Sequence, residues 1–136
     1  MTSMGERLRF STFRLDRLPD GHCRARVELT WRGDQRFESE CEGLASPAGE
    51  LRCAAQACVD ALNQAVADDT GFDLLGVKAV RAFDANVIIV SLAVKGEHGG
   101  RRLVGSCLIE ADVPRGAALA VLNATNRVLG NQLHMR

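Results

Sequence analysis

The fold is decided by the stretch Val27-Glu28-Leu29-Thr30-Trp31-Arg32-Gly33-Asp34, which recurs 63 residues later as Val90-Ser91-Leu92-Ala93-Val94-Lys95-Gly96-Glu97. Both stretches follow the pattern Val-x-Leu-x-apolar-basic-Gly-acidic. The same offset aligns a later group of small residues: Ala54, Ala55, Ala57, Ala61 and Asn63 correspond to Ala117, Ala118, Ala120, Ala124 and Asn126. Two segments that match in one register indicate an internal duplication. We therefore expect one domain over residues 1–136, with repeat units at about 6–68 and 74–130.

Each repeat unit predicts three strands followed by a helix. Period-two alternation bounded by turn residues is typical of strands, and apolar residues three and four apart indicate helices. On these criteria we expect strands at 8–15, 25–32, 36–43, 75–83, 86–95 and 101–111, and helices at 47–68 and 114–130. Duplicated βββα units predict an α+β fold, here a two-layer sandwich of an antiparallel sheet with both helices on one face.

The two halves differ on the strand faces that point away from the helices. The first half presents mainly charged residues there: Arg24, Arg26, Glu28, Thr30, Arg32, Arg36, Glu38, Glu40 and Glu42. The second half is largely apolar, and large apolar patches mark interaction surfaces. We therefore predict a homodimer whose interface contains Ile89, Ser91, Ala93, Val104, Ser106 and Leu108. The alternative is that the N-terminal segment 1–20 folds back over this patch.

Composition narrows the function classes. The chain has 17 basic and 17 acidic residues and a net charge of zero, which argues against a nucleic-acid partner. It has no apolar run long enough for a membrane helix and no signal-like N-terminal segment, so a cytoplasmic protein is expected. The five cysteines include no Cys-x-x-Cys pair, which argues against zinc. Because no catalytic constellation emerges, we expect neither an enzyme nor a bound cofactor or metal.

Several residues carry a resemblance to a known family. Asp84-Ala85 precedes the alternating segment Asn86–Val90, Gly105-Ser106 lies within the last expected strand, and Asp112 lies fourteen residues before Asn126. In these features the chain resembles the C-terminal regulatory domain of 2-isopropylmalate synthase. The first-half loop 43–50 has the family's proline at Pro47 but not its glycine pair and aspartate. The resemblance implies a regulatory domain that binds an amino acid and mediates dimerisation.

Helix N-termini suit a carboxylate ligand because their free N–H groups point toward it. The expected ligand residues are Ser46, Gly49, Glu50, Gly105, Ser106 and Asp112. The alternative for Ser46 and Asp112 is that they simply cap the two helices. We therefore predict a dimeric, small-ligand-sensing regulator, whose partners would be the ligand and an enzyme that it regulates. The alternative function is an RNA-binding regulator that uses the sheet face.

Overall fold

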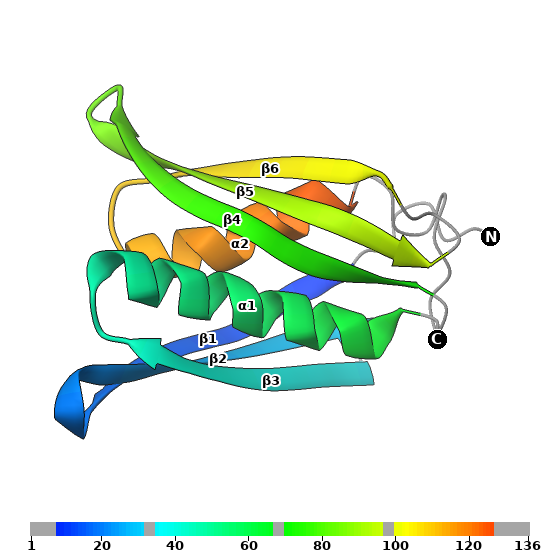
Figure 1. Ribbon diagram of the computed structural model, residues 1–136, viewed down its shortest axis with the longest axis horizontal. Helices are drawn as coiled ribbons and strands as arrows, with labels where there is room; N and C mark the ends of the chain where they lie inside the picture. Colours follow the sequence, from blue (N-terminus) through cyan, green and yellow to red (C-terminus); the bar gives the residue numbers. More distant parts are fainter. Residues whose placement is uncertain (1–7, 32–34, 67–69, 97–99, 127–136) are drawn as a thin grey trace.

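The chain forms two successive βββα units (Figure 1). The structure, a computed structural model, describes residues 8–31, 35–66, 70–96 and 100–126. The first unit contains β1 (Arg9–Leu18), a single 3₁₀ turn (Pro19–Gly21), β2 (His22–Trp31), β3 (Gln35–Leu44) and α1 (Pro47–Ala65). The second contains β4 (Thr70–Ala82), β5 (Ala85–Gly96), β6 (Arg102–Ile109) and α2 (Val113–Asn126). The expected α+β class and the duplicated element order are confirmed.

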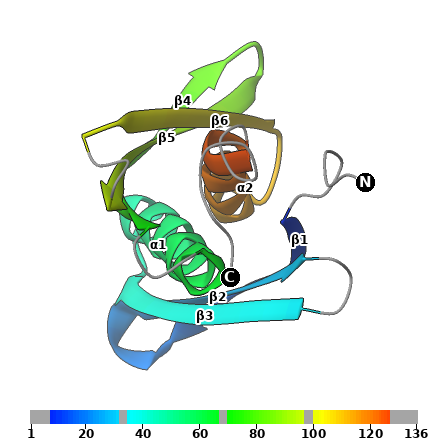
Figure 2. The ribbon, with the colours of Figure 1, turned by 90° about the vertical axis from the view of Figure 1, so that its right-hand side faces the viewer.

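The strands form two sheets rather than the single sheet expected. β1-β2-β3 and β4-β5-β6 are separate antiparallel sheets, and both helices lie between them (Figures 1 and 2). α1 packs on β2 and β3 and also on β4, whereas α2 packs on β5 and β6. The reason lies in the helices: eleven residues of α1 are buried, around most of its circumference. A helix whose buried residues cover most of its circumference needs cover on more than one side.

The duplication is visible in the core. β2 and β5 begin 63 residues apart, at His22 and Ala85, and their inward residues are fully or almost fully buried: Val27, Leu29, Val90, Leu92 and Val94. In the second unit α2 lies very close to its sheet, because a Cβ atom at Gly105 would collide with the Ala120 carbonyl oxygen. Glycine is therefore required on β6 for this approach.

Element ends follow local hydrogen bonds. The Ser46 side chain accepts a hydrogen bond of 3.0 Å from the Gly49 N–H and thereby caps α1. β4 starts at Thr70, five residues earlier than expected, because the Asn63 side chain bonds both backbone groups of Phe72 at 2.8 and 3.0 Å. Thr70 and Gly71, which follow the expected helix 47–68 and precede the expected strand, therefore belong to a strand. The expected end of the second helix at Gly130 lies outside the described residues.

The N-terminal strand does not cover the second sheet. Residues 9–18 pair with β2 in the first sheet, so the alternative in which segment 1–20 lies over the apolar patch is wrong for this strand. The first seven residues lie outside the described part of the chain.

Candidate functional site

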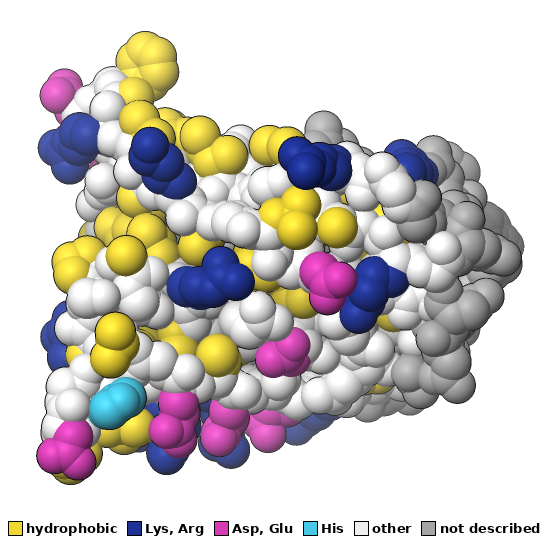
Figure 3. Space-filling model, viewed as in Figure 1, with side chains coloured by type: hydrophobic (Ala, Val, Ile, Leu, Met, Phe, Trp, Pro, Cys, Tyr) yellow, Lys and Arg dark blue, Asp and Glu magenta, His cyan; other side chains and the backbone are white. Residues whose placement is uncertain are grey.

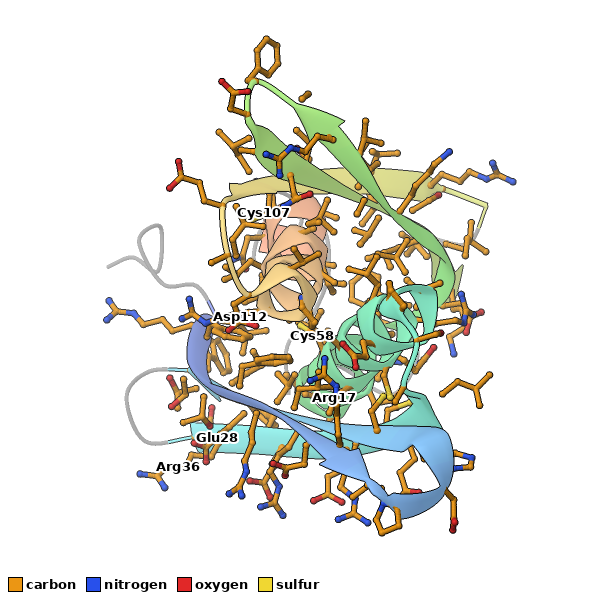
Figure 4. All side chains as sticks on the ribbon, turned by 90° about the vertical axis from the view of Figure 1, so that its left-hand side faces the viewer. Arg17, Glu28, Arg36, Cys58, Cys107 and Asp112 are labelled. Carbon is orange, nitrogen blue, oxygen red and sulfur yellow. The ribbon has the colours of Figure 1, made fainter. Side chains whose placement is uncertain are left out.

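A cavity of about 630 Å³ opens at the end of the molecule where both helices begin (Figure 4). The helices run in the same direction, so their N-termini lie at the same end (Figure 1). α1 packs closely on β4, but α2 makes few contacts with β1, which leaves space between the two units. The lining residues come from β1, the first turn of α1 and the start of α2: Phe13, Arg14, Leu15, Arg17, Glu50, Asp112, Val113 and Pro114.

A charged pair lies in this cavity. The Arg17 guanidinium donates hydrogen bonds of 3.0 and 3.4 Å to the two carboxylate oxygens of Glu50. Glu50 is buried, with 7% exposure, in the first turn of α1, where the helix dipole favours a negative charge. Its hydrogen bond and its charge raise the pKa of Arg17 above the ordinary value. The cation and the anion therefore hold each other at the cavity wall.

Asp112 brings a second carboxylate to the same cavity from the other unit. It has a left-handed backbone (φ 55°) immediately before α2, and its carbonyl accepts the N–H of Gly116 at 3.3 Å. Its side chain is exposed. Residues with a positive φ are uncommon outside glycine, and aspartate is among those that tolerate it best. The tight turn at Asp112 thus places an acidic group beside the first free N–H groups of α2.

Apart from Arg14, the rest of the wall is apolar. Phe13 and Leu15 face inward from β1, opposite Val27 and Ala25 in the pairing register, and Val113-Pro114 closes the other side. Ligand sites are commonly apolar hollows with a few convergent polar groups. This cavity combines both signs of charge with an apolar surface, a combination that suits a small zwitterion with an apolar side chain.

The structure gathers two of the six expected ligand residues, Glu50 and Asp112, at this cavity. Ser46 caps α1. Gly49 packs against the Leu44 carbonyl and lines a separate cavity of about 300 Å³. Gly105 and Ser106 lie within β6, where the Ser106 N–H donates to the Asn123 side-chain oxygen at 3.2 Å.

The most informative cavity residue was missed at the sequence level. Arg17 continues the inward alternation of Phe13 and Leu15 on β1. The expected strand ended at residue 15, so this arginine lay outside it. The available signal was an arginine at the next position on the same strand face, whose side chain is 74% exposed at the open end of the cavity.

The predicted interface residues lie on the outer face of the second sheet. Five large apolar side chains are exposed there, all between 38% and 64%: Leu75, Val80, Ile89, Val104 and Leu108. The outer face of the first sheet instead carries ion pairs, among them Arg24–Glu42 and Arg26–Glu40, both at 2.9 Å. Figure 3 shows these two faces in profile, with alternating charges along the lower edge and apolar side chains interspersed with basic ones along the upper edge. The expected contrast between the two halves is confirmed.

Three cysteines are buried in the core, and Cys41 and Cys107 are half-buried against it. All five are free thiols. Burial and the neighbouring thiols raise the pKa of Cys53 to about 12, and burial also raises the pKa of Cys58. Thiols with raised pKa values are poor nucleophiles because the thiolate is the reactive form. Among the described residues, no group of three or more potential metal ligands is arranged to hold a metal ion.

No protein-family model matches the chain, and no curated protein matches it. Within the described ranges, neither helix has the combination of length and apolar character that a membrane crossing requires.

Proposed function

We propose that this protein is a non-enzymatic regulatory module that senses a small amino acid or a similar carboxylate. The observation that carries the proposal is the convergence of Arg17, Glu50 and Asp112 with two helix N-termini at one cavity whose wall is partly apolar. The free thiols fit a reducing compartment, so we place the protein in the cytoplasm, where it would act on a separate enzyme.

Each part of such a ligand has a matching group in the cavity. Its carboxylate binds the Arg17 guanidinium and the free N–H groups at the start of α2. Its ammonium group binds the carboxylates of Glu50 and Asp112. Its apolar side chain packs against Phe13, Leu15 and Pro114. Arg17 is paired with Glu50 in the structure. Ligand binding therefore requires Arg17 to contact the ligand's carboxylate while Glu50 contacts its ammonium group.

A thermal-shift and calorimetry series tests the ligand. Leucine is compared with 3-methylbutylamine, which lacks the carboxylate, and with 4-methylpentanoate, which lacks the amine. Leucine at a hundred times its dissociation constant should stabilise the protein by about 2.7 kcal/mol, and each analogue should bind more weakly. If no amino acid binds, the proposal is wrong. A shift with RNA alone would instead support the RNA-binding alternative.

Arg17→Gln tests the residue assignment. We expect it to lower the affinity for the amino acid by about tenfold or more, because a charge-assisted hydrogen bond is lost. The matched control is Arg36→Gln, which removes an arginine beside Glu28 on the outer face of the first sheet. Calorimetry on protein shown to be folded by circular dichroism gives the two affinities. Equal affinities would exclude Arg17 from the site.

A further inference from the structure

The outward-facing residues of the second sheet form rows that run across its three strands. Counted from the β4–β5 hairpin, the first cross-strand row contains Val80, Val87 and Leu108. The second row contains Lys78, Ile89 and Ser106. The third row contains Gly76, Ser91 and Val104, with the bulge residue Leu75 beside it. The fourth contains Asp73, Ala93 and Arg102. Through these four rows the face is apolar or small along β5, and Lys95 follows at the next outward position. The acidic and basic groups of the fourth row lie on opposite edges.

We propose that a second copy of this chain stacks on the outer face of the β4-β5-β6 sheet, about a two-fold axis that runs along β5. Two sheets can pack face to face in nearly aligned directions, and a two-fold interface buries the same patch on both subunits. An axis along β5 places β4 of one copy opposite β6 of the other. Residues of β5 then lie opposite their own counterparts.

This axis gives complementary contacts in the first, third and fourth rows, and it places Lys78 opposite Ser106 in the second. Val80 lies opposite Leu108 of the second copy, and Leu75 lies opposite Val104. Asp73 lies opposite Arg102, and the contact occurs twice by symmetry. Arg102 is exposed, and Asp73 bonds only Lys95 of its own chain, at 3.4 Å, among the described residues. Charge complementarity therefore favours a second copy in this orientation.

An axis across the strands fits worse. It would reverse the row order and place the charged fourth row against the apolar first row, so that Arg102 faced Leu108. A charge against an apolar surface loses hydration without gaining a partner. The order of residues thus selects the axis along β5.

The β4–β5 hairpin fits the same arrangement. It extends past the end of β6 and rises above the plane of that strand (Figures 2 and 4). Its turn holds Phe83 and Asp84 in left-handed conformations (φ 55° and 59°), and Phe83 is 91% exposed. A bulky residue in this region is strained and needs a compensating gain. In the dimer the hairpins pass side by side, and each Phe83 packs beyond the end of the partner's shorter β6.

A charge-swap series measured by sedimentation tests the axis. We expect Asp73→Arg and Arg102→Asp each to raise the dimer dissociation constant by about tenfold or more, because like charges then meet twice. The double variant should restore dimerisation. Circular dichroism checks folding, which these exposed positions should not disturb. A wild-type monomer at micromolar concentration, or a double variant as weak as the single variants, would overturn the proposal.

Cysteine cross-linking gives an independent measurement. Ser91→Cys lies near the axis and should form an interchain disulfide with its own counterpart under mild oxidation. Ser106→Cys is the matched control, because Ser106 lies on β6, away from the axis, opposite Lys78 of the second copy. Faster cross-linking at position 106 than at position 91 would exclude this axis. Dimerisation through this face does not require the ligand cavity. The dimer and the ligand site can therefore be tested separately, and failure of one proposal leaves the other open to its own test.

Discussion

At the residue scale, Gly105 sets the distance between α2 and its sheet. A Cβ atom there would collide with the Ala120 carbonyl and lie 2.7 Å from the Ala124 Cβ atom. Gly105→Ala should therefore destabilise the protein by about 1–3 kcal/mol, the usual cost of overpacking. The matched control is Gly76→Ala on β4, where a Cβ would have nothing within 4 Å, and where a change within about 0.5 kcal/mol is expected. Chemical denaturation of both variants measures the difference, and equal free energies of unfolding would contradict this account.

Single residues also show what sequence patterns can and cannot predict. The inward positions of β2 and β5 were predictable, because period-two alternation fixes which side chains share a face. Glu50 and Asp112 were predictable as residues at helix starts, although not as neighbours. Arg17 was missed because its role depends on where β1 ends, and strand boundaries are weakly encoded in local sequence.

At the element scale, the start of α1 tests whether Ser46 is a cap or a ligand contact. Ser46→Ala should cost about 1 kcal/mol of stability, because the Gly49 N–H loses its acceptor. Ser46→Asp should keep the stability, since aspartate caps equally well. Neither variant should change the affinity for the amino acid measured by calorimetry. A loss of affinity with unchanged stability would instead place Ser46 in the ligand site.

The elements themselves were largely predictable, but the grouping of the strands was not. Alternation and helical spacing identify three strands and a helix in each unit. They do not say which strand edges pair, so one sheet and two sheets look alike in the sequence. The distinguishing signal was in α1, where alanines and other apolar residues cover more of the helix than a single packed face requires and therefore need cover from two directions.

At the scale of the whole molecule, the helix layer makes the two units depend on each other. α1 belongs to the first unit but also packs on β4, and the helices pack on each other. The units are not packed symmetrically: the α1–β4 side is closed, whereas the α2–β1 side is open and holds the cavity. The same layer therefore supplies both the shared core and the proposed ligand site.

This shared core predicts that the two units unfold together. Trp31, the single tryptophan, is half-buried on β2 and reports on the first unit by fluorescence, whereas far-ultraviolet circular dichroism reports on both helices. Their denaturation midpoints should coincide, as in a two-state transition. Gly105→Ala, which acts in the second unit, should shift the fluorescence midpoint of Trp31 as far as the dichroism midpoint. If the variant moved only the dichroism signal, the units would be independent, and a cavity built between them could not couple ligand binding to the whole chain.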